Sequence, residues 1–377
     1  MLSLSLTAAL KERASELGFG PAGVCPAVTP AGLHRFHDWL AAGYAGEMTY
    51  LADRADAYAH PEHVLEGVRS VLMLAMPYRT VEPPAGVPPG WGRISRYAWG
   101  TDYHDLIRER LGLLATFLRE LEPAASVRGV VDTAPLLERE FAELAGVGWI
   151  GKNTLLLNKH FGSWFFLAAL LTDIELEYDA AHEAHHCGTC RACLDVCPTG
   201  ALVDAYVLDA RKCISYLTIE LRSSVPDDLR TGVGDWLFGC DLCQEVCPWN
   251  HRAPHVDEPG LMPTAEGGFV ELAELFTLTD DEFRRRFRHT PLWRPKRRGI
   301  LRNAAIVLGN QAGRLEGSER ERAMSALERA AADCELLVRG AAVWALGQFN
   351  DLQAADVSSP RSTTIAKNSA KLEETAC

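Results

Sequence analysis

Cysteines dominate one stretch of this 377-residue chain, because eight of the eleven fall between residues 187 and 247. The first run is Cys187-x-x-Cys190-x-x-Cys193-x-x-x-Cys197-Pro198, which is the spacing of bacterial ferredoxins that hold two 4Fe–4S clusters. The second run is Cys240-x-x-Cys243-x-x-x-Cys247-Pro248, and Leu237 stands where a leading cysteine would be expected. Cys213, alone between the two runs, is the candidate that replaces it.

Ferredoxin spacing also predicts how the eight thiolates divide, since the fourth cysteine of a run binds the other cluster. One cluster would be held by Cys187, Cys190, Cys193 and Cys247. The second cluster would be held by Cys197, Cys213, Cys240 and Cys243. Zinc is the first alternative, but structural zinc sites usually show two CxxC pairs without a third close cysteine or a CP ending. Disulfides are the second, and they require an oxidising compartment for which the N-terminus offers no export signal.

A carboxylate stands at the end of a predicted strand, in the segment Asp132-Thr133-Ala134-Pro135. Open α/β sheets place their ligand sites at such strand ends. If a large cofactor shielded it, this carboxyl could have a raised pKa and donate a proton. The alternative is an ordinary helix N-cap ahead of Pro135, and the residues alone favour the cap.

The segment Gly148-Trp-Ile-Gly-Lys-Asn-Thr154 combines glycines, a lysine and an amide side chain in a predicted loop. Such a loop could cradle the amides or phosphates of a cofactor, although it lacks the spacing of a P-loop. A surface turn with a solvated lysine is the alternative.

Basic residues concentrate between residues 283 and 315, which contain ten arginines and lysines and no acidic residue. The whole chain has a net charge of -12, so this segment is a local exception. Trp293 and His289 lie among the arginines, as expected of a surface that binds phosphates and stacks on bases. The charge pattern predicts nucleic-acid binding, with RNA favoured.

The order of predicted elements indicates an α/β layered domain over residues 1–175. Helical periodicity covers residues 2–18, 30–42, 104–121 and 135–144, and strands are predicted at residues 70–76, 127–131 and 165–171. The cysteine-rich domain follows at residues 176–256. No apolar run reaches the length of a membrane span, and the free thiols indicate a reducing cytoplasm.

Residues 257–349 are predicted to be helical, and two segments there look alike. Ala304-Ala-Ile-Val-Leu-Gly309 and Ala342-Val-Trp-Ala-Leu-Gly347 are offset by close to the ~40-residue period of HEAT or armadillo repeats. Two packed helices with small residues at their crossing are the alternative. Residues 350–377 have few large apolar side chains and are predicted to form a disordered tail.

The motifs taken together resemble epoxyqueuosine reductases from the N-terminus to about Phe349. The resemblance is carried by both cysteine runs and by the segments Arg96-Tyr-Ala-Trp-Gly-Thr-Asp-Tyr-His104, Val131-Asp-Thr-Ala-Pro-Leu-Leu-Glu-Arg139, Gly148-Trp-Ile-Gly-Lys-Asn153, Cys213-Ile-Ser-Tyr-Leu-Thr-Ile-Glu-Leu-Arg222 and Gly239-Cys-Asp-Leu-Cys-Gln-Glu-Val-Cys-Pro-Trp-Asn250. Family members usually end in ordered helix, whereas this chain turns low in complexity after Phe349.

What the resemblance implies is a cobalamin-dependent enzyme that reduces epoxyqueuosine to queuosine at the wobble position of tRNA. It implies a cobalamin domain akin to reductive dehalogenases, a two-cluster ferredoxin-like domain and C-terminal HEAT-like repeats that help to hold the tRNA. Electrons would pass from an external low-potential donor through the clusters to cobalamin. Asp132 would be the proton donor, kept protonated by burial against the corrin, which reverses the preference for the cap.

The resemblance also implies cofactor and tRNA contacts. The cobalamin pocket would include Arg54, Asp132, Gly151, Lys152, Asn153, Leu155, Asp241 and Leu242. The tRNA would meet Arg222 and the basic segment through Arg294, Lys296, Arg297 and Arg298. A corrinoid reductive dehalogenase and an iron–sulfur electron-transfer protein remain the alternative functions.

Overall fold

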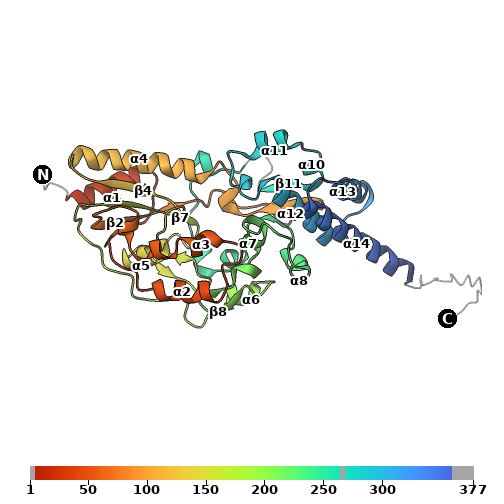
Figure 1. The fold of residues 1–377 in the computed structure, drawn as a ribbon, viewed down its shortest axis with the longest axis horizontal. Coiled ribbons are helices and arrows are strands. Elements are labelled where there is room, and N and C mark those ends of the chain that lie inside the picture. The colour runs from red at the N-terminus through yellow and green to blue at the C-terminus, as the bar shows by residue number, and fades with distance from the viewer. Residues whose placement is uncertain (1–4, 264–267, 359–377) are drawn as a thin grey trace, which may run out of the picture.

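The computed structural model describes residues 5–263 and 268–358. Figure 1 shows an elongated molecule in which the N-terminal sheet and its helices lie at one end and helices α13 and α14 at the other. The cysteine-rich segment lies between them, near α6, α7 and β8.

A four-stranded sheet with the order β1-β2-β7-β4 forms the centre of the N-terminal part. Its strands are β1 (Ala22–Pro26), β2 (Ser70–Pro77), β4 (Val127–Val130) and β7 (Phe165–Thr172). Every neighbouring pair is antiparallel. Strands and helices therefore alternate as the sequence predicted, but the open parallel sheet behind the strand-end argument for Asp132 is absent from the described residues.

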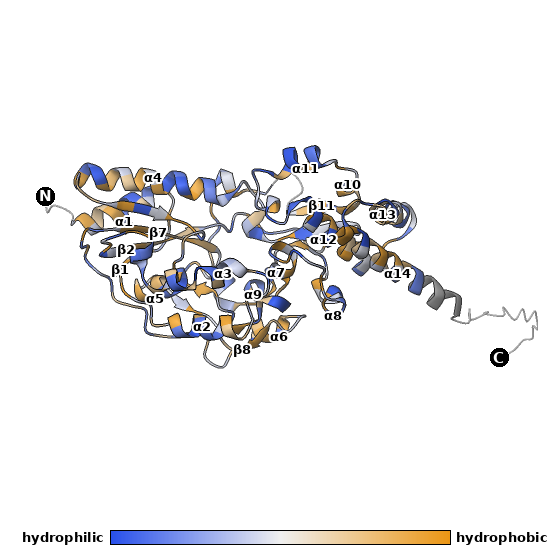
Figure 2. Ribbon diagram, in the orientation of Figure 1, coloured by the Kyte–Doolittle hydropathy of each residue, from blue (hydrophilic) through white to orange (hydrophobic). Residues whose placement is uncertain are grey.

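Helices cover both faces of this sheet because its central strands are apolar on both sides. Side chains of β2 alternate between the faces, so Leu72 and Leu74 pack under α1 (Leu6–Glu16) and α4 (Tyr103–Leu121). Val71 and Met73 face the opposite way, toward α5 (Glu138–Leu144). Figure 2 shows these strands in orange between helices that carry blue residues on their outer sides. The predicted helix and strand positions in this region are confirmed to within a few residues.

The remaining elements surround this core. The other helices are α2 (Leu33–Ala41), α3 (Thr49–Asp53), α6 (Ala192–Val196), α7 (Ile214–Ile219), α8 (Asp227–Arg230), α9 (Leu242–Glu245), α10 (Leu272–Leu275), α11 (Asp280–Phe287), α12 (Lys296–Asn310), α13 (Gly317–Ala330) and α14 (Leu336–Ser358). The other strands are β3 (Trp91–Ile94), β5 (Trp149–Ile150), β6 (Leu156–Leu157), β8 (Leu202–Asp204), β9 (Val207–Leu208), β10 (Trp236–Phe238) and β11 (Phe269–Glu271). No helix among the described residues is both long and apolar enough to cross a membrane.

A small sheet joins the three predicted domains. It has the order β10-β3-β11, and its strands come from the cysteine-rich, N-terminal and C-terminal parts in turn. Arg302 on α12 strengthens the same junction, because its buried guanidinium donates to the carbonyl oxygens of Leu217, Leu221 and Ser223. The division into three domains therefore stays a prediction. Backbone hydrogen bonds of this sheet cross both predicted boundaries, after residues 175 and 256.

HEAT-like repeats are not confirmed in the C-terminal part. The two similar segments lie on α12 and α14, which pack directly against each other. A Cβ added at Gly309 would lie 2.6 Å from Cζ3 of Trp344 and 3.0 Å from Cα of Ala345, whereas one added at Gly347 would meet nothing within 4 Å. In a repeat, Gly309 and Gly347 would be equivalent positions, but their surroundings differ. This difference is expected of two helices that cross at small residues.

The predicted start of the tail at Asn350 is wrong, because α14 continues through it to Ser358. The residues after Asn350 include no proline or glycine before Pro360, so nothing in the local sequence stops the helix. Residues 359–377 lie outside the described residues.

The helix crossing predicts opposite effects of one substitution at the two glycines. Gly309→Ala should lower the free energy of unfolding by about 1–3 kcal/mol, because the methyl group overpacks the crossing. Gly347→Ala should raise it by up to about 1 kcal/mol, since alanine favours a helix where there is space. Urea unfolding of the anaerobic protein measures both, and equal effects at the two positions would contradict the crossing.

Candidate functional site

Asp132 lies just beyond β4, in a loop with unusual backbone geometry. Its φ is 37°, in the left-handed region that residues other than glycine rarely adopt. Helix α5 begins only at Glu138 and has Leu137 as its N-cap. The N-cap interpretation of Asp132 is therefore wrong, and the strained backbone turns its carboxylate away from the helix end.

The Asp132 carboxylate is hydrogen-bonded to two neighbouring side chains of α4. Nε2 of His104 lies 2.8 Å from Oδ1, and the Tyr103 hydroxyl donates to Oδ2. The other ring nitrogen of His104 lies 2.6 Å from Oδ1 of Asp102. The backbone N–H of Asp132 donates to Oε1 of Glu138 at 2.8 Å, which fixes the loop against α5.

These contacts decide where the proton resides. Burial raises the pKa of the Asp132 carboxyl, but the hydrogen bond and charge of His104 outweigh burial, so this pKa lies below its ordinary value. Burial lowers the pKa of His104, but the two flanking carboxylates raise it to about 9. In the protein alone these two pKa shifts favour an ionised Asp132 beside a protonated His104, and a protonated Asp132 under a bound corrin stays a prediction.

Glu138 adds a second titratable group to the site. Burial and the nearby charge of Asp132 raise the pKa of its carboxyl to about 8.

Aromatic packing also holds the imidazole of His104, because it stacks on Tyr103 with ring centroids 4.1 Å apart. Tyr103 in turn stacks on Phe166 of β7 at 4.1 Å and 9°.

Sequence reasoning did not assign roles to Tyr103, His104 or Glu138. All three lie inside segments that carry the family resemblance, and that was the available signal. Asp102 was also given no role, because an aspartate directly before a helix is an ordinary N-cap. It caps α4 by accepting from the backbone N–H of His104, and the same oxygen also faces the His104 ring.

Arg54 lies beside the Asp132 loop, as the predicted pocket requires. Its Nη1 donates to the carbonyl oxygen of Thr133 at 3.2 Å. The loop of residues 151–155 is connected to the Asp132 loop through α5. Arg139 on α5 donates a hydrogen bond to the carbonyl oxygen of Thr154. Within that loop, the N–H of Gly151 donates to the carbonyl oxygen of Leu155 at 2.8 Å.

Lys152 and Asn153 reach toward the cysteine-rich segment instead. The Lys152 ammonium donates to the carbonyl oxygens of Gly188 and Cys190 at 2.6 and 2.9 Å. The buried Asn153 amide lies 3.5 Å from the carbonyl oxygen of Cys243. The loop therefore supports the backbone around predicted cluster ligands, and a surface turn with a solvated lysine does not describe it.

Asp241 is an internal anchor. Its side chain is 1% exposed and accepts from the Ser95 hydroxyl at 2.6 Å and from the Arg96 N–H at 2.8 Å. Burial raises the pKa of its carboxyl. Leu242, the next residue, begins α9 and packs at the edge of the core. A corrin contact of Asp241 would have to use its backbone, because both carboxylate oxygens are occupied.

The predicted division of the thiols into two groups stays a prediction, because Cys243 has both Cys197 and Cys193, one from each group, among its charged neighbours. Burial raises the pKa of the Cys193 and Cys247 thiols, and Cys187 is a charged neighbour of both, with Cys190 adding to Cys247. In the second group, burial raises the pKa values of Cys213, Cys240 and Cys243, whose charged neighbours include one another and Cys197. Among the described residues, no three His, Cys, Asp or Glu side chains are close enough to hold a single metal ion.

The basic segment is partly neutralised by residues distant in sequence. Arg297 donates to Asp333 at 3.0 Å and to the carbonyl oxygen of Leu278, so its side chain is used inside the protein. Arg294 pairs with Glu220 at 2.9 Å. The predicted tRNA contacts of the segment stay a prediction, and Arg297 is the one whose guanidinium is most used inside the protein.

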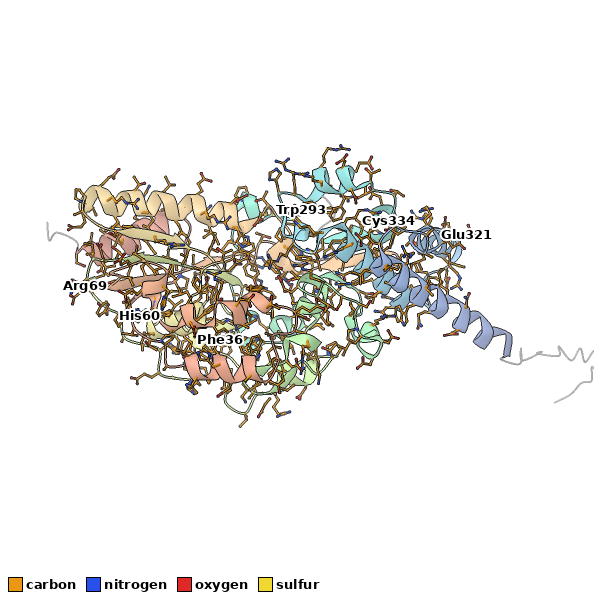
Figure 3. The ribbon with its side chains drawn as sticks, in the orientation of Figure 1. Phe36, His60, Arg69, Trp293, Glu321 and Cys334 are labelled. Atoms are coloured by element: carbon orange, nitrogen blue, oxygen red, sulfur yellow. The ribbon has the colours of Figure 1, made fainter. Side chains whose placement is uncertain are left out.

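Arg222, Arg294, Lys296 and Arg298 are the remaining predicted tRNA contacts, and Glu220 neutralises part of their charge through Arg294 and Arg222. Arg222 donates to the carbonyl oxygen of Arg294 at 3.2 Å, and Lys296 lies 4.0 Å above the Trp293 ring. Burial and the charges of Arg222 and Arg294 lower the pKa of Lys296. Arg298 is exposed on the first turn of α12. In Figure 3, Trp293 marks this region, where the C-terminal helices meet the rest of the molecule.

Comparisons with known proteins agree with this arrangement. A family model described as a 4Fe-4S double cluster binding domain matches residues 186–250, and one described as epoxyqueuosine reductase QueG, DUF1730, matches residues 59–133. An epoxyqueuosine reductase of Pseudomonas aeruginosa is 44% identical over 310 residues, which is 81% of this chain and 85% of that protein. One of Xanthomonas campestris pv. campestris is 39% identical over 345 residues, 90% of this chain and 95% of that protein.

Solved structures are similar over nearly the whole length. A crystal structure of selenomethionine-labeled epoxyqueuosine reductase has a TM-score of 0.83 and 31% identity, covering 94% of each chain. A crystal structure of epoxyqueuosine reductase with a tRNA-Tyr epoxyqueuosine-modified stem loop also has a TM-score of 0.83, with 32% identity over 92% of this chain and 91% of that one.

The two carboxylates around His104 predict a pH-dependent contribution to stability. Because the pKa of His104 rises from 6.5 to about 9 on folding, its contribution is present below pH 6.5 and is lost as the pH rises through about 9. His104→Asn should therefore destabilise the protein by about 1–2 kcal/mol near pH 6.5, with exposure of Asp132 limiting the value.

Anaerobic urea unfolding of both proteins between pH 6 and pH 10 measures this difference. Glu138 titrates in the same range, and the charge of His104 lowers its pKa, so Glu138→Gln is introduced into both proteins to remove that titration. A difference that stays constant across the range would show that His104 does not carry the proton.

Proposed function

This chain belongs to the epoxyqueuosine reductase family, and from that premise we propose that it reduces epoxyqueuosine to queuosine at the wobble position of tRNA. The observation that carries the proposal is the Asp132–His104 pair. It provides a proton at a partly exposed carboxylate, in a chain that also contains two groups of four cysteines.

The reaction sets what the protein must supply. Removing the epoxide oxygen as water leaves an alkene and consumes two electrons and two protons. Electrons and protons need separate routes, because side chains of ordinary redox potential carry protons but not low-potential electrons. The cysteine groups support the first route and the Asp132 site the second.

The donor sets support two 4Fe–4S clusters and a cobalamin. Each cysteine group provides the four thiolates that such a cluster requires. Arg54 and the exposed side of the Asp132 loop would border the cobalamin, together with Leu155 and the backbone at Gly151. When bound, cobalamin would supply the low-valent cobalt that delivers electrons to the substrate.

Asp132 and His104 divide the proton chemistry between them. Asp132 is half-exposed and faces the open side of the loop, so its carboxylate would contact the substrate oxygen. His104 lies behind it and holds a proton up to about pH 9. The proton can pass from His104 to Asp132 across the 2.8 Å hydrogen bond, and from Asp132 to the departing oxygen.

The tRNA would lie across Arg222, Arg294, Lys296 and Arg298. Glu220 links two of these cations, because it pairs with Arg294 at 2.9 Å and lies 3.6 Å from Arg222. Trp293 supplies an aromatic face beside them, as RNA-binding surfaces often do.

We also propose an external low-potential electron donor and a reducing cytoplasm, which free thiolates and a tRNA substrate require.

Asp132→Asn tests the catalytic assignment. The variant should retain both clusters and cobalamin but lose turnover by about two to four orders of magnitude, because the amide cannot transfer a proton in this way. The reconstituted enzyme is supplied with cobalamin, a reductant and epoxyqueuosine-containing tRNA. Mass spectrometry of the digested tRNA then measures the product that has lost one oxygen atom.

Asp38→Asn on α2 is the matched control, since it removes an exposed carboxylate that is not among the hydrogen-bond partners of Asp132 or His104. Normal turnover by Asp132→Asn would remove Asp132 from the mechanism. A wild-type protein that holds clusters and cobalamin but dehalogenates small organohalides, or turns over neither substrate, would favour the two alternative functions.

Lys296→Ala and Arg298→Ala test the proposed tRNA surface. Each should weaken tRNA binding and reduce the slope of log Kd against log salt by about one, because each removes one phosphate contact. Arg69→Ala is the control, since Arg69 pairs with Glu175 at the N-terminal end of the molecule, away from Trp293 (Figure 3). An equal loss for all three variants would indicate a net-charge effect without a defined surface.

A further inference from the structure

Three buried nitrogen atoms without partners gather at one place beside the first cysteine group. Trp149 is 0% exposed, and its indole Nε1 has no hydrogen-bond partner among the described residues. The Nε2 atoms of His182 and His186 are also buried without partners. Only five such side-chain atoms occur in the described part of the chain, so three at one location need a common explanation.

The rings that carry these nitrogens form one packed group. The Trp149 ring stacks on His182 with centroids 5.4 Å apart and meets the edge of His186 at 4.7 Å. Trp249 closes the group at 5.0 Å from Trp149. Cys187 and Cys247 pack into the same apolar cluster, so two predicted ligands of one iron–sulfur cluster border these rings.

An unpaired buried N–H costs the full desolvation of that group, so native proteins rarely leave one without an acceptor. The indole nitrogen of Trp149 can only donate, and a neutral imidazole can carry its proton on Nε2. The missing acceptor must therefore come from outside the polypeptide. Anionic sulfur fits, because cysteinate and sulfide atoms of a bound cluster would stand beside these rings.

We propose that Trp149, with His182 and His186, donates N–H hydrogen bonds to sulfur atoms of the cluster held by the Cys187 group, and thereby raises its reduction potential. Hydrogen bonds to the sulfurs are one of the factors that set cluster potentials. The reduced cluster carries one more negative charge and accepts these bonds more strongly. The inference rests on the cluster binding in the proposed function and does not depend on the tRNA substrate.

The position of the Cys187 cluster indicates what a raised reduction potential would do. Cys190 is exposed, whereas Cys240 and Cys243 in the other group are partly buried. The Cys187 cluster is therefore the one that an external donor can approach. A raised potential would allow that donor to reduce it more completely.

Trp149→Phe tests the proposal, because phenylalanine keeps an aromatic ring in the group but removes the N–H. Redox titrations followed by electron paramagnetic resonance measure the potential of each cluster in the reconstituted protein. We expect the reduced-to-oxidised ratio of one cluster to fall by up to about tenfold at a fixed potential, which corresponds to about 59 mV for one electron. The other cluster should titrate as in the wild type.

Trp249→Phe is the matched control, since its ring belongs to the same group but its nitrogen is not among the buried unpartnered atoms. It should leave both potentials unchanged. The proposal is overturned if Trp149→Phe shifts neither cluster, shifts both alike, or shifts no more than the control.

Iron and sulfide contents separate this result from a failure of the proposed function. A wild-type protein without two clusters contradicts the proposed function, whereas two clusters with unshifted potentials contradict only the hydrogen bonds. If Trp149→Phe fails to load, wild-type protein labelled with ¹⁵N in its tryptophan indoles replaces it. Pulsed resonance should then detect ¹⁵N coupling to one reduced cluster, and its absence overturns the proposal.

Discussion

The arrangement of the redox part depends on a buried network of polar side chains within the second cysteine run. The Gln244 side-chain oxygen accepts from the hydroxyls of Ser163 and Tyr78 at 2.8 and 3.2 Å, while its nitrogen donates to Asp241. The side-chain nitrogen of Asn250 completes the network by donating to the backbone carbonyl oxygen of Gln244 at 2.7 Å. Each partner is buried, so any shift of this segment along the sheet would leave several polar groups unpaired. The segment therefore has one position against β2 and β7, and its cysteines are fixed with it.

That constraint extends to the first cysteine run through the 151–155 loop. Lys152 binds carbonyl oxygens next to Cys187 and Cys190, while Asn153 reaches the carbonyl oxygen of Cys243. One short loop thus contacts the backbone of both cysteine groups. Arg139 connects the same loop to α5, and Glu138 connects α5 to Asp132. The proton site and the electron route are held in one framework, although their residues lie far apart in the sequence.

Sequence patterns predicted the features that depend on local spacing and failed where distant partners decide. The continuous apolar run at residues 70–76 predicted β2 correctly, because a strand buried on both faces is apolar along its whole length. Ferredoxin spacing is also a local rule, and the division of the thiols that it predicts stays a prediction. Antiparallel pairing of the sheet could not be read from alternating strands and helices. The basic segment looked free because Asp333, the partner of Arg297, lies 36 residues away. Likewise, no local pattern shows that Asp132 has a φ of 37° and therefore caps no helix.

The charge of Asp132 is compatible with its proposed role, because proton donation depends on the transfer path as well as on the resting proton. A carboxylate that shares a hydrogen bond with a protonated imidazole can pass a proton to substrate and receive another from His104. A large ligand over the open side of the loop would desolvate Asp132 further and raise its pKa, which moves the shared proton toward the carboxylate. His104 would still be flanked by Asp102, whose negative charge favours the imidazolium. The site would then deliver its proton only when it is covered, which keeps proton transfer coupled to occupancy of the pocket.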